Sequence, residues 1–128
     1  MKRSIPSPDW GTPRAVIANG FIFLSGTTSK HPDGYYLAAD DIVEQTNIVL
    51  DRIEADLKAA GSSLDDVVKV TVFLRDIKQW KEFNETYLKR FGKNRPARTT
   101  IQAGGFEDGA CIEMDVIAIV AESDSAGN

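Results

Sequence analysis

The run Val67–Leu74 constrains the fold more than any other part of the chain. β-Branched or apolar side chains occupy nearly every position, which is typical of a central strand that is covered on both faces. A helical pattern lies on each side of it, because apolar residues recur at helical spacing from Asp41 to Gly61 and again from Asp76 to Gly92. The chain is therefore expected to build a sheet with this strand inside it and helices packed against it.

Two further pairs of strands complete the pattern. Near the N-terminus, Asn19-Gly20 separates two β-favouring runs and predicts a hairpin. Residues 98–103 and 110–121 predict two more strands. The resulting order, ββαβαββ, predicts an α+β fold: a single two-layer domain with a mixed β-sheet and two helices on one face. We expect residues 1–128 to form this one domain, with flexible ends at 1–8 and 122–128.

This arrangement leaves the second face of the sheet without cover. The strands at 67–74 and 111–121 carry apolar residues on both sides, whereas only two helices are available to bury them. Exposed apolar patches above roughly a few hundred Å² are rare on monomers. The sequence therefore predicts a homo-oligomer that buries the open face.

Composition excludes several classes of function. A formal net charge of −4 argues against nucleic acid as a partner, because such surfaces are normally basic. One His and one Cys provide no metal-ligand set of recognisable spacing, so no metal is expected. No apolar stretch is long enough to span a membrane. The N-terminal residues lack the apolar core of a secretory signal, and the lone Cys111 has no partner for an internal disulfide, so a cytoplasmic location is expected.

Arg98 and Glu113 are the candidate functional residues, because each places a charge inside a strand-like run near the C-terminus. If these two runs pair as an antiparallel hairpin that turns at Gly105-Phe106, Arg98 faces Glu113 on the same side of the sheet. The pair is then either a surface salt bridge of little consequence or a site. A guanidinium suits a ligand carboxylate, and a nearby Glu can orient or deprotonate water, so the pair predicts hydrolysis of a small carboxylic acid.

These residues also carry a resemblance to a known family. Pro96-Ala97-Arg98 is followed at characteristic spacing by Gly104-Gly105 and Ile112-Glu113-Met114, and the match extends over nearly the whole chain. Supporting segments are Asn19–Thr27, Ala60–Lys69, Val72–Asp76 and Phe83–Tyr87. The chain resembles the RidA family, also called the YjgF or L-PSP endoribonuclease family.

The resemblance implies a chorismate-mutase-like fold that assembles as a homotrimer, with sites between subunits. It implies a cofactor-free deaminase that hydrolyses small enamines and imines of the 2-aminoacrylate type to 2-keto acids and ammonia. In that pattern Arg98 grips the substrate carboxylate, and Glu113 positions the hydrolytic water. Ser25 and Gly26 match a Ser-Gly pair at a strand end that helps to hold the ligand, and Asn84 matches a helix Asn that lines the cleft.

Two departures from the family pattern concern the shape of the substrate. Thr100 stands where RidA proper has Cys, although a backbone N–H contact at this position is expected to persist with any side chain. The aromatic residue that closes the cleft in RidA proper has no clear counterpart, because the direct match falls near Thr12 and the nearest aromatic residue is Trp10. Trp10 is therefore a candidate for closing the cleft and contacting the substrate.

Two alternative functions follow from the same residues. The segment Ser25–Asp33 is similar to one in 2-aminomuconate deaminases, a branch of the superfamily that acts on an enamine dicarboxylate in aromatic degradation. The departures at Thr12 and Thr100 instead favour a non-catalytic, metabolite-binding trimer. Ribonuclease activity, which the family name suggests, has little support from an acidic chain with a single loop His.

Overall fold

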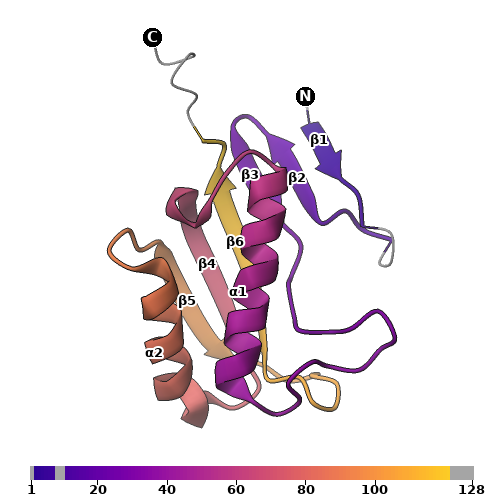
Figure 1. The fold of residues 1–128 in the computed structure, drawn as a ribbon, viewed down its shortest axis with the longest axis vertical. Helices are drawn as coiled ribbons and strands as arrows, with labels where there is room; N and C mark the ends of the chain where they lie inside the picture. Colours follow the sequence, from indigo (N-terminus) through magenta and orange to yellow (C-terminus); the bar gives the residue numbers. More distant parts are fainter. Residues whose placement is uncertain (1, 8–10, 122–128) are drawn as a thin grey trace.

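The computed structural model of the chain describes residues 2–7 and 11–121 (Figure 1). Trp10, a candidate ligand contact, lies outside the described residues. The strands are β1 (Lys2–Ile5), β2 (Ala15–Ala18), β3 (Phe21–Leu24), β4 (Val67–Leu74), β5 (Ala97–Gln102) and β6 (Ile112–Ile119). The helices are α1 (Ile42–Ala59) and α2 (Trp80–Phe91), with short 3₁₀ turns η1 (Leu64–Asp66) and η2 (Ile77–Gln79).

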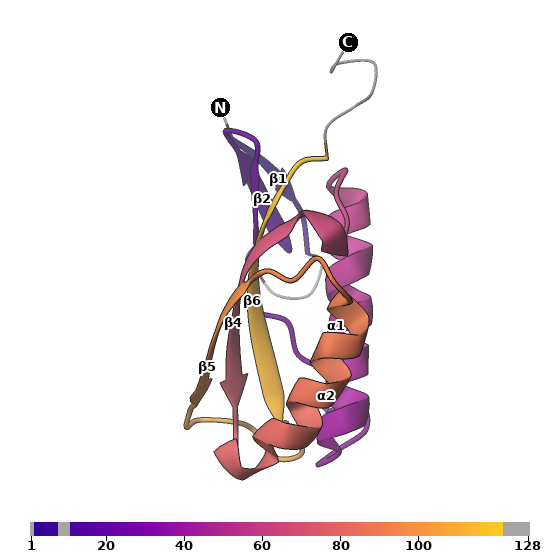
Figure 2. The same ribbon diagram turned by 90° about the vertical axis from the view of Figure 1, so that its left-hand side faces the viewer.

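The predicted two-layer α+β fold is confirmed. The six strands form one mixed sheet in the order β1-β2-β3-β6-β4-β5. Helices α1 and α2 pack beside each other on the same face of this sheet, and no helix of the described chain covers the other face (Figures 1 and 2). Strand β1, which the sequence pattern did not indicate, adds an antiparallel edge to β2.

The predicted pairing of the two C-terminal strands is wrong. Strand β4 lies between them, parallel to β5 and antiparallel to β6. A strand, helix and strand in succession favour a crossover that lays β5 parallel beside β4, so the chain must then pass the end of β4 to reach its other side. Hydrogen bonds from Ala103 N to Leu74 O (2.9 Å) and from Arg75 N to Cys111 O (3.0 Å) hold this passage against β4.

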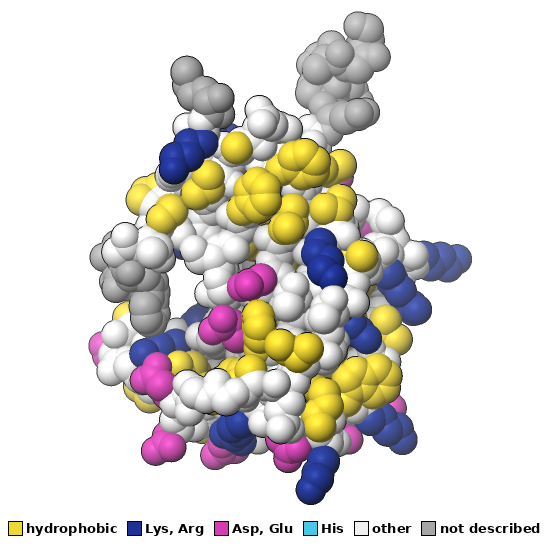
Figure 3. Space-filling model, turned by 180° about the vertical axis from the view of Figure 1, so that it is seen from behind, with side chains coloured by type: hydrophobic (Ala, Val, Ile, Leu, Met, Phe, Trp, Pro, Cys, Tyr) yellow, Lys and Arg dark blue, Asp and Glu magenta, His cyan; other side chains and the backbone are white. Residues whose placement is uncertain are grey.

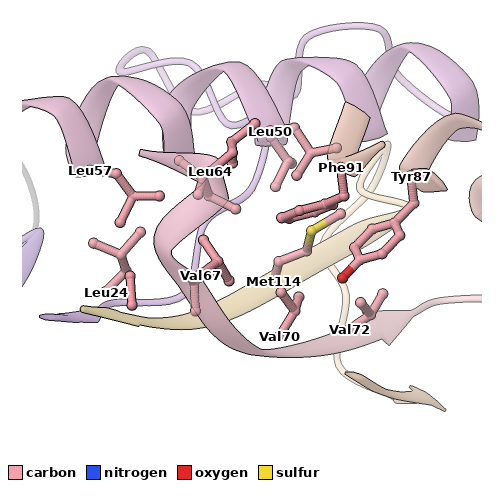
Figure 4. Packing of buried hydrophobic residues seen from close by; sticks show 14 of the residues in the cluster. Leu24, Leu50, Leu57, Leu64, Val67, Val70, Val72, Tyr87, Phe91 and Met114 are labelled. Atoms are coloured by element: carbon pink, nitrogen blue, oxygen red, sulfur yellow. The ribbon is translucent and has the colours of Figure 1, made fainter. Parts of the chain in front are cut away.

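The core lies between the helices and the sheet (Figure 4). Alternate residues of β4, namely Val70, Val72 and Leu74, are fully buried under the helices. Asp41 caps α1 as predicted, because its carboxylate accepts a hydrogen bond from Glu44 N at 3.1 Å. Each buried aliphatic side chain in such a core contributes about 1.5–3 kcal/mol of transfer free energy. The sequence pattern and the packing therefore agree on which face of each element is inside.

Gln45 ties the start of α1 to two connecting segments. Its side chain is fully buried, and its amide nitrogen donates to the carbonyl oxygens of Leu37 (3.2 Å), Ala38 (3.1 Å) and Gly109 (2.6 Å). Its amide oxygen accepts a hydrogen bond from Cys111 N at 2.8 Å. The three carbonyls each accept a second hydrogen bond, from Ser29 Oγ, Asp41 N and Asp40 N respectively, whereas the buried N–H of Cys111 has Gln45 as its partner. The bond to Cys111 also fixes the residue directly before β6, which lies two residues before Glu113.

The Gln45 network predicts a large effect on stability. Gln45→Leu should lower the free energy of unfolding by about 1–3 kcal/mol, because a side chain of similar size would leave the buried N–H of Cys111 without a partner. Denaturant unfolding checks this. The matched control is Thr46→Val at the next buried position, where the hydroxyl donates only to Ile42 O within the same helix, and the expected loss is below about 1 kcal/mol. Equal losses in the two variants would contradict the assigned role.

Candidate active site

Glu113 projects from β6 onto the open face of the sheet. Its position pairs with Phe73 of β4, and the residues beside it in β6, Ile112 and Met114, are fully buried on the helix side. The side chain itself is half-buried. A carboxylate thus stands on the face that has no helix over it.

Gly26 gives this carboxylate its place. A Cβ atom at Gly26 would lie 2.6 Å from Glu113 Oε2 and 3.0 Å from Glu113 Cδ, so the carboxyl group could not stay in this position beside any larger residue. The next residue, Thr27, forms an isolated antiparallel bridge with Met114, with N–H···O distances of 2.9 and 3.0 Å. The backbone after β3 is therefore held directly against β6. Glycine is needed here for the close approach of the carboxylate rather than for an unusual dihedral angle.

Ser25 precedes Gly26 in the chain and lines the same cavity as Glu113. Its hydroxyl donates to Pro13 O at 2.7 Å, and its backbone N–H donates to Arg14 O at 3.0 Å. The hydroxyl oxygen still has lone pairs, which can accept a hydrogen bond from a ligand. The structure thus brings Ser25, Gly26 and Glu113 together, as the family pattern implies.

The environment of Glu113 raises its pKa. Burial is the larger cause, and the neighbouring negative charge of Asp115 adds to it. Burial also raises the pKa of Asp115. Arg98, which would lower the pKa of Glu113 if the two residues were in contact, is not one of the causes of this shift within one chain. A carboxyl group shifted upward in this way is better suited to accept and return a proton near neutral pH.

Two cavities meet at Glu113. A small one of about 180 Å³ is lined by Phe73, the segment Ala103–Phe106 and Glu113. A larger one of about 690 Å³ runs from Ser25, Gly26 and Glu113 towards α1. Figure 3, which views the molecule from the side opposite the helices, shows acidic side chains beside a hollow in this face. Glu113 is common to both cavities and can reach a ligand in either.

Arg98 occupies a different part of the molecule. It lies in β5 and aligns with the buried Val70 of β4, so its side chain faces the helices. Its Nη1 donates to Asn84 Oδ1 of α2 at 2.8 Å. Its guanidinium carbon lies over three aromatic rings, at 4.7 Å from the centroid of Tyr87, 5.5 Å from that of Phe83 and 6.0 Å from that of Trp80. Aromatic faces attract the cation and fix the plane of the guanidinium.

Hydrogen-bonding capacity around Arg98 is not fully used. Tyr87 Oη, from a ring beside Arg98, and Thr100 Oγ1, on the same face of β5, are buried, and neither has a hydrogen-bond partner within the described part of the chain. Burial raises the pKa of Tyr87 to about 12, and the nearby charge of Arg98 only partly opposes this effect. Figure 4 shows Tyr87 reaching from α2 towards the sheet. Because buried polar groups are almost always bonded, these atoms mark the region as one that can receive a polar ligand.

The predicted contact between Arg98 and Glu113 is wrong within one chain. Arg98 aligns with Val70 on β4, whereas Glu113 aligns with Phe73 on the same strand. Positions an odd number of residues apart on a strand point to opposite faces of the sheet. The two charges therefore lie on opposite faces, with β4 between their strands. The error follows from the hairpin pairing, which assumed that β5 and β6 are neighbours.

Several residues of the larger cavity were not predicted from the sequence. Its lining includes Arg14, Lys30 and Arg52, together with Tyr36 and Glu107. In the sequence, charged residues on a helix or in a loop have the appearance of ordinary surface positions. Only their convergence in space distinguishes them, and no local pattern encodes it.

The described residues offer no cluster of three or more His, Cys, Asp or Glu side chains that could hold a metal ion. Within the same residues, no helix has the length and apolar character needed to cross a bilayer. His31, predicted to be a loop residue, lies between β3 and α1, where its ring stacks on Tyr35 at a centroid distance of 4.5 Å.

Comparison with known proteins agrees with the fold and identifies a family. The family model described as Endoribonuclease L-PSP matches residues 6–120. A RutC family protein of Pyrococcus abyssi is 38% identical and covers 88% of this chain and 89% of its own length. Reactive Intermediate Deaminase A of Arabidopsis thaliana, named as chloroplastic, is 36% identical over 82% of this chain and 56% of its own length.

Solved structures give the same result. The crystal structure of yeast Mmf1 is 33% identical, with a TM-score of 0.82 over 92% of this chain and 94% of its own. A YjgF-family protein from Mycobacterium tuberculosis is 30% identical, with a TM-score of 0.81 over 94% of this chain and 100% of its own. The chain therefore belongs to the Endoribonuclease L-PSP family, whose members also carry the names YjgF, RutC and reactive intermediate deaminase.

Proposed function

We propose that this protein is a cofactor-free hydrolytic deaminase that converts small carboxylate-bearing enamines or imines into 2-keto acids and ammonia. The observation that carries the proposal is the half-buried Glu113 carboxyl, with its raised pKa, held against Gly26 at the mouth of two cavities. Membership of a family that includes a reactive intermediate deaminase supports the reaction type.

Arg98 serves as the carboxylate clamp in this proposal. The bond to Asn84 engages one terminal nitrogen, and the aromatic rings support the flat side of the group. A planar guanidinium forms two parallel hydrogen bonds with a carboxylate, which fixes the orientation of the substrate as well as its position. The backbone N–H and the unpaired hydroxyl of Thr100 lie on the same strand, within β5. Together these groups would hold the acid end of the substrate.

Glu113 acts on water. In the imine form of the substrate, water adds to the carbon of the C=N bond while Glu113 takes a proton from that water. The same carboxyl group returns that proton to nitrogen, which gives a carbinolamine with one hydroxyl and one amino group on the same carbon. A second transfer through Glu113 moves the hydroxyl proton to the amino group, the C–N bond breaks, and ammonia leaves as the carbonyl of the 2-keto acid forms. Ser25 can accept a hydrogen bond from the substrate nitrogen. Each step uses only proton transfer and needs no electron acceptor.

The complete site requires a second copy of the chain. One small ligand cannot touch Arg98 and Glu113 of the same chain, because the two residues lie on opposite faces of the sheet. The open face carries large apolar side chains that a partner could cover, with exposed fractions of 45% for Phe21 and 43% for Phe23. Figure 3 shows hydrophobic side chains gathered on this face. We infer a homotrimer in which Arg98 and Asn84 of one subunit meet Ser25, Gly26 and Glu113 of the next.

A binding protein without turnover is the second candidate. It would use the same Arg98 clamp, and the substitution of Thr100 for the Cys of RidA proper is the observation that favours it. RNA cleavage is not part of the proposal, because a chain with a net charge of −4 is a poor match for a polyanion. A cytoplasmic location is proposed from the single, buried Cys111, although relatives include proteins named as mitochondrial and chloroplastic.

Complementation between two inactive variants tests the shared site. Arg98→Ala and Glu113→Gln should each lower kcat/KM for an imine generated in situ by at least about ten- to a hundredfold, the loss expected for one charge-assisted contact. Co-assembly of equal amounts should restore activity, since about a quarter of the sites would then combine an intact Arg98 with an intact Glu113. Keto-acid release is the measurement.

Two controls accompany the mixing experiment. Arg98→Lys should behave like Arg98→Ala, because Lys lacks the planar fork, whereas Arg75→Lys in a surface ion pair with Asp40 should have little effect. Mixed assemblies that stay inactive, although both variants exchange subunits, would place both residues in one subunit's site. Full activity in Arg98→Ala would remove the proposed clamp.

Gly26→Ala separates site geometry from folding. The new Cβ would displace the Glu113 carboxyl group, whose end is flexible, so stability should change by less than about 1 kcal/mol while activity falls by about tenfold or more. Thermal unfolding and keto-acid release measure the two effects. If the melting temperature fell sharply as well, the loss of activity would be explained by unfolding, and a role of Gly26 in site geometry would not be supported.

The acid limb of the pH–rate profile reports the pKa of Glu113. Activity should fall as the pH drops through a value above the ordinary 4.5 of a Glu side chain, because the protonated acid cannot take a proton from water. Asp115→Asn removes a negative charge that raises this pKa, so the limb should move to lower pH. A limb that does not move would show that another group controls it.

A further inference from the structure

Phe73 lies directly beside the proposed catalytic carboxyl group. In β4 it aligns with Glu113 of β6 on one side and with Ile101 of β5 on the other. Aligned residues of neighbouring strands point to the same side of the sheet, and across an antiparallel pair their Cβ atoms lie about 4.5–5.5 Å apart. The three side chains therefore form one row across the open face, with the half-buried ring of Phe73 in the middle.

Gly26 occupies the other side of Glu113. The bridge between Thr27 and Met114 holds the backbone after β3 against β6, on the edge of β6 that faces away from β4. A Cβ atom at Gly26 would lie 2.6 Å from Glu113 Oε2, so the carboxyl group reaches over the glycine. Glu113 thus has a large ring on one side and the smallest residue on the other.

Hydrogen bonds do not hold Glu113 in this position. Within the described part of the chain, its side chain receives no hydrogen bond and forms no ion pair. A Glu side chain without such contacts can adopt several rotamers, so packing must select among them. Phe73 takes up space on the β4 side, and the missing side chain of Gly26 leaves room on the other. Packing therefore directs the carboxyl group towards Gly26.

The small cavity shows what kind of surface Phe73 presents to the carboxyl group. Its lining consists of the rings of Phe73 and Phe106, residues 103–105 and Glu113, which is the only charged residue among these lining residues. Carbon surface next to a carboxylate displaces water that would otherwise solvate the charge. Burial is accordingly the first cause of the raised pKa of Glu113.

Charged neighbours have a smaller effect on Glu113. On β6 itself, Asp115 raises the pKa of Glu113 further, although less than burial does. On the same face of β4, Lys69 donates to Thr99 Oγ1 at 2.7 Å. The remaining titratable groups belong to the larger cavity, whose lining does not include Phe73: Arg14, Lys30, Tyr36, Arg52, Asp56 and Glu107. A change at Phe73 would leave all of these charges in place.

We propose that Phe73 is a positioning residue for the reaction: its ring covers the β4 side of the Glu113 carboxyl group, restricts that group to the Gly26 side and keeps water away from it. The inference rests on the proposed function, in which Glu113 takes a proton from water. A base that is already oriented and partly desolvated needs less rearrangement before proton transfer. Phe73 acts through Glu113 and requires no contact with the substrate.

Two substitutions at Phe73 test this role. Phe73→Ala should lower kcat by about tenfold or more with little change in KM, because the base loses its orientation. The acid limb of the pH–rate profile should move to lower pH, because water then reaches the carboxylate and stabilises its charge. Phe73→Leu keeps an apolar cover, so it should retain most of the activity and the position of the limb. Keto-acid release from an imine generated in situ is the measurement.

Ile101→Ala is the matched control, because it removes a large apolar side chain from the same row without uncovering Glu113. It should leave the acid limb in place. Thermal unfolding and light scattering follow the stability and assembly of all three variants. An acid limb that stays in place in Phe73→Ala would overturn the inference even if activity fell, because the ring would then serve folding or assembly alone. Phe73→Leu with the defect of Phe73→Ala would also overturn it.

A titration of Glu113 followed by carboxyl ¹³C NMR separates this inference from the proposed function. The pKa of Glu113 should be lower in Phe73→Ala than in the parent protein, and Glu113→Gln identifies the signal. A lower pKa in a protein that releases no keto acid would support the role of Phe73 and count against the function. An unchanged pKa in a protein that does release keto acid would overturn the inference and leave the function standing.

Discussion

The pairing of β4 on both of its edges is the constraint on which the rest of the structure depends. Because β5 and β6 take opposite sides of this strand, every side chain of the sheet is assigned to the helix layer or to the open face by its register with β4. Val70, Val72 and Leu74 hold the helices in place. The same alternation sends Arg98 to the helix layer and Glu113 to the open face. Fold and site are thus consequences of one strand.

Much of the fold was predictable because its signals are local. The caps and periodicity of α1 lie within single turns of helix, and Asn19-Gly20 adopts the positive φ values, 53° and 79°, that its hairpin requires. The second helix begins slightly later than predicted, because Asp76 caps the short turn η2 by accepting a hydrogen bond from Lys78 N. The order of the strands was not predictable in the same way, since the pairing of β5 with β4 depends on a crossover rather than on adjacent residues.

The residues of the candidate site also differ in whether the sequence could indicate them. Arg98 and Glu113 were identifiable because a charge inside a strand is unusual, and Ser25, Gly26, Asn84 and Thr100 followed from the resemblance. Their grouping was not identifiable, because the face that each residue takes depends on its register with β4, which lies between the two strands. Arg14, Lys30 and Arg52 gave no signal at all, since their sequence context is that of solvent-exposed positions. Their significance comes from the shared cavity alone.

The ring cluster around Arg98 affects how tightly a very small ligand can bind. A free arginine side chain loses roughly 2 kcal/mol of rotamer entropy when it is immobilised, and a ligand with few atoms has little interaction energy to offset that loss. Here Asn84, Phe83, Tyr87 and Trp80 restrict the guanidinium as part of folding. In the proposed role of Arg98, an incoming acid would therefore meet a preorganised receptor. Packing a cation among aromatic rings in the helix layer would then give such a clamp a high ligand efficiency for a compact carboxylate.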